Sequence, residues 1–168
     1  MDQSTVTGAK QQFQAYAPPD EHKPLAGYAL LMVAFNALCA GGLVASRSRL
    51  TERVETRDLT LLTIATHKLS RLIAKDKVTS AVRAPFTRFE DDAGPSEVSE
   101  APRGTGVRKA VGELISCPFC VAQWIAAAAL FGLIYAPRTT RFVAAMFTIV
   151  AGSDFLQLAY KAAQDKGL

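Results

Sequence analysis

Residues 25–45 read LAGYALLMVAFNALCAGGLVA, and this stretch decides the class of the protein. Its only strongly polar side chain is Asn36. About 20 residues at a helical rise of about 1.5 Å cover the roughly 30 Å hydrocarbon core of a bilayer. We therefore predict that this segment is a helix that spans a membrane.

Two further apolar segments follow, at residues 115–136, closed by Pro137, and at residues 142–160, interrupted by Asp154 and Gln157. The whole chain of 168 residues is 49% apolar and 20% charged, which is ordinary for a soluble protein. The charges, however, are nearly absent from the first two apolar segments. We predict an all-α integral membrane bundle of three spanning helices, in which the second and third form a hairpin.

Residues 58–77 have a different pattern, because they combine one apolar and one basic helical face. The apolar face carries Leu59, Leu62, Thr66, Leu69 and Ile73, and the basic face carries Lys68, Arg71 and Lys75. Such a helix lies in the headgroup region or packs against the ends of a bundle. Both alternatives predict an interfacial amphipathic helix.

The remaining segments of the chain are polar. Residues 90–106 gather acids, Pro, Ser and Gly, bury too little apolar surface to offset their ordering entropy, and are predicted to be a disordered linker. Residues 1–24 are predicted to be a disordered tail without the features of a signal peptide, and residues 161–168 a C-terminal tail. The membrane domain is then residues 25–160.

Most Lys and Arg residues lie between Arg47 and Lys109. Because basic loops stay in the cytoplasm, this loop and the C-terminus are predicted to be cytoplasmic and the N-terminus outside. The net charge of +4 comes from basic residues that are interleaved with acids and adjoin apolar segments. This distribution predicts a lipid bilayer, and not nucleic acid, as the anionic partner.

Cys117 and Cys120 enclose Pro118 and Phe119 at the predicted start of the second spanning helix. The helix dipole there favours the thiolate, which would make the pair a redox or metal site. Zinc needs about four ligands, so His67 or the same pair from a second subunit would complete the set. In the alternative interpretation, Pro118 starts the helix and both cysteines pack at the membrane boundary.

Asp154 interrupts the third apolar segment. A carboxylate inside a membrane costs a few kcal/mol unless it is protonated, paired or facing water. The candidate partners are Lys68, Arg71, His67, Asn36 and Gln123. A structural ion pair is one interpretation of Asp154, and a small proton- or ion-coupled carrier subunit is the other.

Several separated motifs follow one another along the chain: ATHKLSRLI at 65–73, DKVTS at 76–80, RAPFT at 83–87, CPFC at 117–120 with Trp124, and SDF at 153–155. Together, in this order, they resemble the bacterial family named domain of unknown function 1360 (DUF1360). The resemblance covers roughly residues 25–160 and implies a bacterial membrane protein, without implying a substrate or cofactor.

No phosphate-binding glycine loop, metalloprotease helix or nucleophile elbow occurs in the sequence. We therefore expect no catalysis outside the cysteine pair. The expected function is a structural or interaction component of the bacterial cytoplasmic membrane, which self-associates or binds other membrane proteins.

Overall fold

The structure, a computed structural model, describes residue 16 and residues 23–49 and 54–167. The helices are α2 (Leu25–Ser46), α3 (Thr56–Lys75), α4 (Ser80–Arg83), α5 (Gly106–Ser116), α6 (Pro118–Tyr135) and α7 (Pro137–Asp165), and the strands are β1 (Thr87–Asp92) and β2 (Val98–Pro102). The predicted helical class is confirmed, since α2, α6 and α7 are long and apolar enough to cross a membrane. Most of the predicted tail 1–24 lies outside the described residues.

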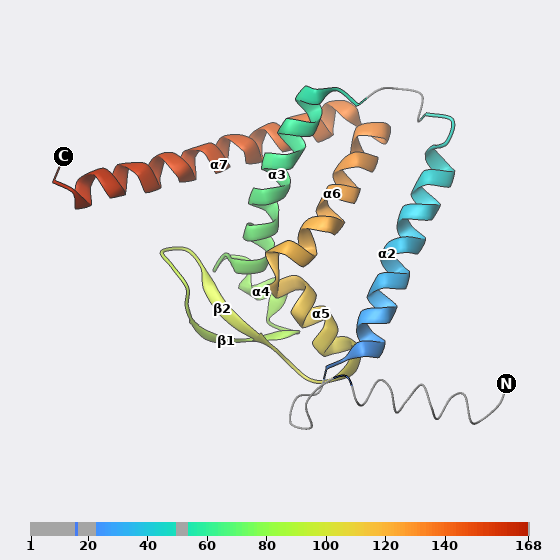
Figure 1. The fold of residues 1–168 in the computed structure, drawn as a ribbon, viewed down its shortest axis with the longest axis horizontal. Coiled ribbons are helices and arrows are strands. Elements are labelled where there is room, and N and C mark those ends of the chain that lie inside the picture. The colour runs from blue at the N-terminus through green and yellow to red at the C-terminus, as the bar shows by residue number, and fades with distance from the viewer. Residues whose placement is uncertain (1–15, 17–22, 50–53, 168) are drawn as a thin grey trace.

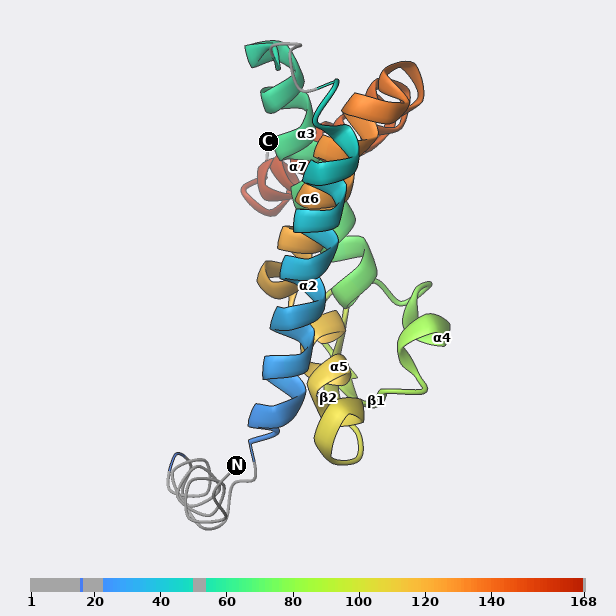
Figure 2. The same cartoon turned by 90° about the vertical axis from the view of Figure 1, so that its right-hand side faces the viewer.

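Helix α2 runs parallel to the α5–α6 segment (Figures 1 and 2). The residue numbers of the contacting pairs increase together along both segments. The pairs are Tyr28 with Glu113, Phe35 with Trp124, Gly42 with Phe131, and Arg49 with Tyr135. The Phe35 and Trp124 rings meet edge to face with centroids 5.2 Å apart. The Arg49 guanidinium lies 5.3 Å from the centre of the Tyr135 ring.

Because α2 and α6 are parallel, the chain must return along their length after α2 and before α6, and α3 makes this return on the side of α6 away from α2 (Figure 1). Leu62 and Ala65 of α3 are buried against Leu133 of α6 and Ala144 of α7. Helix α3 therefore packs against the sides of α6 and α7. The expected placement of residues 47–109 on one side of a membrane would require antiparallel α2 and α6, whereas the two helices run parallel.

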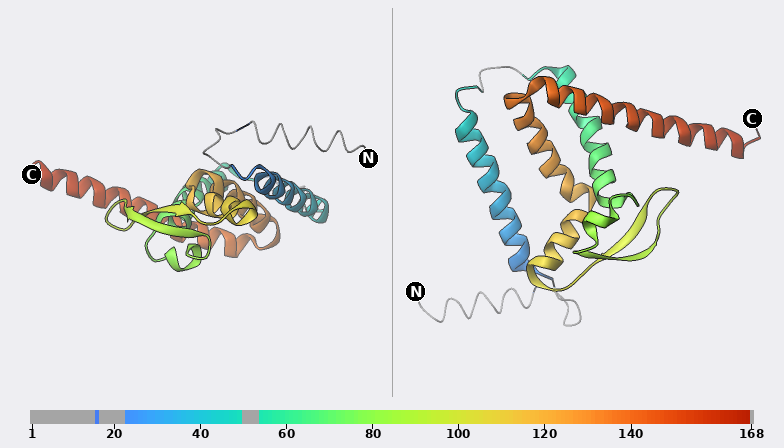
Figure 3. Two further views of the ribbon diagram at one scale, coloured as in Figure 1. Left: turned by 90° about the horizontal axis from the view of Figure 1, so that it is seen from below. Right: turned by 180° about the vertical axis from the view of Figure 1, so that it is seen from behind.

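Helix α7 does not fold back along α6 as the predicted hairpin requires. It leaves the end of α6 at a steep angle, crosses α3 and extends beyond the rest of the molecule (Figures 1 and 3). Where the two helices cross, the Thr148 hydroxyl of α7 donates a hydrogen bond of 3.1 Å to the Leu61 carbonyl of α3. The packing of α7 is thus chiefly against α3.

Pro118 divides the predicted second span into two helices. A residue before proline is disfavoured in the helical conformation, and Cys117 is extended, with φ −103° and ψ 108°. Helix α5 accordingly ends at Ser116 and α6 begins at Pro118. The predicted span 115–136 therefore began inside the preceding helix.

The linker predicted to be disordered contains most of an antiparallel hairpin, in which Thr87 pairs with Pro102 and Asp92 with Val98. Its acids bind cations of the preceding segment, because Glu97 lies 2.6 Å from Arg71. A second ion pair, between Lys77 and Asp92, measures 2.9 Å. The acids that suggested a solvated linker are the groups that attach the hairpin to the rest of the fold.

The packing of α5 against the hairpin can be tested by substitution of Gly112, because a Cβ at this position would lie 2.5 Å from the Phe86 carbonyl oxygen. We expect Gly112→Ala to lower the free energy of unfolding by about 1–3 kcal/mol, since the crowded backbone must shift. Gly41→Ala is the control, because a Cβ there meets no atom within 4 Å. Equal thermal unfolding of both variants in detergent would contradict this packing.

Candidate functional site

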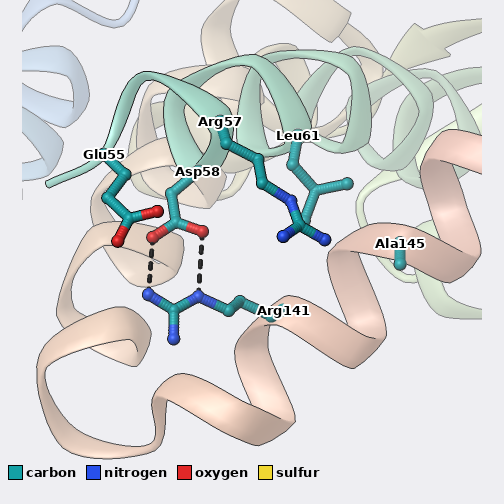
Figure 4. A pocket seen from close by; sticks show the side chains of 6 residues that line it. All are labelled: Glu55, Arg57, Asp58, Leu61, Arg141 and Ala145. Carbon is teal, nitrogen blue, oxygen red and sulfur yellow. Dashed lines mark hydrogen bonds and ion pairs between the residues drawn. The ribbon is translucent and has the colours of Figure 1, made fainter.

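A bidentate ion pair joins the first turns of α3 and α7 (Figure 4). Arg141 donates from Nε and Nη2 to the two carboxylate oxygens of Asp58, over 2.9 and 2.7 Å. Asp58 is buried, whereas about half of the Arg141 side chain is exposed. Two parallel hydrogen bonds fix both the distance and the relative orientation of the helices at this point.

Asp154 is paired with one of its predicted partners. Its carboxylate lies 2.6 Å from the Lys68 ammonium of α3. Arg71, the other candidate cation, instead donates from Nε and Nη2 to Glu97 of the hairpin, over distances between 2.6 and 3.0 Å. This pairing supports the interpretation of Asp154 as a structural partner of α3.

The uncharged candidates do not join Asp154. The Asn36 side chain donates a hydrogen bond of 2.8 Å to the Met32 carbonyl within its own helix. Gln123 lines a groove between α2 and α6, and His67 is exposed on α3. No hydrogen bond from these three side chains to Asp154 occurs among the described residues.

The cysteine pair lies at the break between α5 and α6. The Cys120 backbone N–H donates to Cys117 Sγ over 3.3 Å, so that Cys117 caps the helix. Both thiols are free, with Cys120 exposed and Cys117 partly buried. The part of the chain that is described brings no three His, Cys, Asp or Glu side chains together as metal ligands, so His67 does not complete this pair. Zinc here would need ligands from a second chain.

A buried polar cluster, which the sequence analysis missed, surrounds Arg83. This residue is only 1% exposed, and it donates to both carboxylate oxygens of Glu100, over 2.8 and 3.0 Å. It also donates to the Ile73 carbonyl over 2.7 Å and to the Asp76 carbonyl over 3.0 Å. One guanidinium thus joins the end of α3 to the hairpin.

Hydroxyl groups complete the cluster. The Thr87 hydroxyl donates to Glu100 over 2.7 Å, and the Ser80 hydroxyl lies 3.0 Å from the Arg83 guanidinium. Burial by itself would raise the pKa of Glu100, but the hydrogen bonds from Arg83, Thr87 and Ser80 hold that pKa below its ordinary value. The motifs at 76–80 and 83–87 supply most of this cluster, so they were the sequence feature from which it could have been predicted.

Comparison with known proteins identifies one family. The profile of "Protein of unknown function (DUF1360)" matches residues 61–160. This segment contains Cys117 and Cys120, Arg83 and Asp154, but it leaves out α2. Sporulation protein YjcA of Bacillus subtilis (strain 168) is 38% identical over 71 residues, which are 40% of this chain and 60% of that protein. The chain therefore spans less than two thirds of this relative. No solved structure matches the chain.

Glu100→Gln should lower the free energy of unfolding by about 3–5 kcal/mol, because it leaves the buried Arg83 charge without a counter-ion. Since the pKa of Glu100 is lowered from 4.5, its carboxylate contributes fully above that pH and loses its contribution as the pH falls through the lowered value. The difference between the wild type and Glu100→Gln should therefore shrink on acidification, as measured by denaturant unfolding. A difference that is constant with pH would refute the assigned pair.

The Lys68–Asp154 pair can be tested with a double-mutant cycle on thermal stability. Asp154→Asn leaves the Lys68 ammonium unpaired, so adding Lys68→Met should recover part of the loss, with a coupling of at least about 0.5 kcal/mol. Arg71→Met is the matched control, because Arg71 binds Glu97, and its effect should add to that of Asp154→Asn. Coupling to Arg71 in place of Lys68 would exclude the pair.

Proposed function

The chain belongs to the family described as protein of unknown function (DUF1360), and from this premise we propose that it is a multi-pass protein of the bacterial cytoplasmic membrane with a structural or interaction role. One observation carries the proposal: only 6% of the apolar stretch is buried in α2, and only 6% in α6. Their exposed side chains are large and apolar, among them Met32, Val33, Leu38, Val44 and Leu130. Lipid chains would cover this surface, which water would solvate poorly.

The polar groups of α3 are compatible with a place among these helices, and we include α3 as a crossing helix. The hydroxyls of Thr60, Thr63 and Ser70 donate to carbonyls three or four residues earlier in the same helix, over 2.7–3.0 Å. Such bonds satisfy hydroxyl groups where water is absent. The charged residues Asp58 and Lys68 are paired with α7. A polar helix that is satisfied in this way can cross beside apolar ones.

Four crossings, by α2, α3, α6 and obliquely by α7, put both chain ends and residues 76–117 on one side. Helix α7 has 29 residues, more than a bilayer core requires, and a long apolar helix accommodates the excess by tilting. More Lys and Arg belong to this side than to the opposite side, which holds residues 47–55 and the junction of α6 and α7 at 136–141. The proposed cytoplasmic side is therefore the one that holds the hairpin and both termini, in place of the expected outside N-terminus.

Labelling of single cysteines distinguishes this topology from one in which α3 stays on one side. In a chain without its native cysteines, Ser48→Cys reports the α2–α3 loop and Ser96→Cys the hairpin. We expect a membrane-impermeant maleimide to label Ser48→Cys in intact protoplasts, but Ser96→Cys only after lysis.

Thr139→Cys, an exposed position in the first turn of α7, is the control and should behave as Ser48→Cys does. If Ser48→Cys and Ser96→Cys are protected alike while Thr139→Cys reacts, α3 does not cross. If the chain does not fractionate with membranes at all, the membrane role itself fails.

A further inference from the structure

A cleft of about 360 Å³ lies between the first turns of α3 and α7. Its walls are Glu55, Arg57, Asp58, Leu61, Arg141 and Ala145. Figure 4 shows the Arg57 side chain extending from α3 into this space, beside the paired Asp58 and Arg141. The cleft thus combines an ion pair, a second guanidinium and apolar groups.

Of the charged side chains that line the cleft, two are paired with each other and two are not. Asp58 and Arg141 neutralise each other through their two hydrogen bonds. Glu55 and Arg57 make no side-chain hydrogen bond or ion pair with any other residue that the structure describes. Among the described residues, the cleft therefore presents one carboxylate and one guanidinium that are outside any hydrogen bond or ion pair, with Leu61 and Ala145 as apolar neighbours.

The position of the cleft suggests the ligand. It lies at the end of the molecule where α6 meets α7 and where Arg49 packs on Tyr135 (Figure 1). Arginine and tyrosine are residues that favour the boundary between lipid chains and headgroups. In the proposed membrane arrangement, the cleft therefore opens at the level of the headgroups.

We infer that this cleft binds a phospholipid headgroup that carries both a phosphate and a primary ammonium, as in phosphatidylethanolamine. The inference rests on the proposed membrane role. The Arg57 guanidinium suits the phosphate, because its fork donates paired hydrogen bonds to two oxygens. The Glu55 carboxylate suits the ammonium, which has three N–H donors. Leu61 and Ala145 offer apolar contact to the first carbons of the lipid.

The test is a lipid titration of the purified full chain in detergent micelles, read by native mass spectrometry. Phosphatidylethanolamine, phosphatidylglycerol and phosphatidylcholine with identical acyl chains are compared, and free phosphoethanolamine is added to separate lipid from soluble headgroup. We expect the tightest binding for phosphatidylethanolamine. Arg57→Gln should weaken it at least about tenfold, because the amide carries no charge and cannot donate the paired hydrogen bonds of the guanidinium to the phosphate.

Glu55→Gln should remove the preference for phosphatidylethanolamine over phosphatidylglycerol, because only the former carries the ammonium. Arg88→Gln is the matched control, since Arg88 is an exposed arginine of β1 far along the chain from the cleft, and it should leave binding unchanged. Equal binding of the three lipids, or unchanged binding by Arg57→Gln, would overturn the inference. Competition by free phosphoethanolamine at equal concentration would assign the site to a soluble headgroup instead.

These outcomes are separable from those of the proposed function. A chain that fractionates with membranes and shows the expected cysteine labelling, yet binds the three lipids equally, loses only the headgroup site. Arg57 makes no hydrogen bond to another described side chain, so its substitution should not unfold the chain, and thermal unfolding of the variant verifies this.

Discussion

A charge that leaves water needs a counter-charge, and the position of α3 depends on this constraint. The helix carries one acid and several bases and nevertheless packs along α6 and under the crossing α7. Asp58 is held by Arg141 and Lys68 by Asp154, so two ion pairs along one side attach α3 to α7. Without them the fold would place charged groups against apolar neighbours, and α3 would be more stable at a water-facing surface.

The same constraint explains the hairpin. Arg83 is almost completely buried, and its guanidinium is satisfied by Glu100 of β2 on one side and by carbonyls and hydroxyls of residues 73–80 on the other. None of the described buried side-chain nitrogen and oxygen atoms lacks a hydrogen-bond partner. A hydrogen-bond network of this kind specifies a single arrangement of the chain, because a partly formed network would leave buried polar groups without partners at a high cost in free energy. The hairpin therefore acts as the connection between α3 and α5.

Prediction from the sequence succeeded where the signal is local. The apolar run from Leu25 needs only its own length and composition to identify it as a helix able to span. It failed for residues 90–106, since the arginine partners of Glu97 and Glu100 lie 26 and 17 residues away in the chain. Composition cannot distinguish an acid solvated by water from one paired with a distant arginine. The Lys68–Asp154 pair was among the predicted alternatives, but spacing did not separate it from Arg71.

The sequence by itself determined the helical class and the three long apolar helices, because both follow from the chemistry of neighbouring residues. Only the tertiary structure decided that α2 and α6 run parallel, that α3 returns along the other side of α6, and that Arg57 and Glu55 line one cleft. The direction of one helix relative to another depends on contacts such as Phe35 with Trp124, which join residues far apart in the chain. No local pattern of hydrophobicity or charge contains that information.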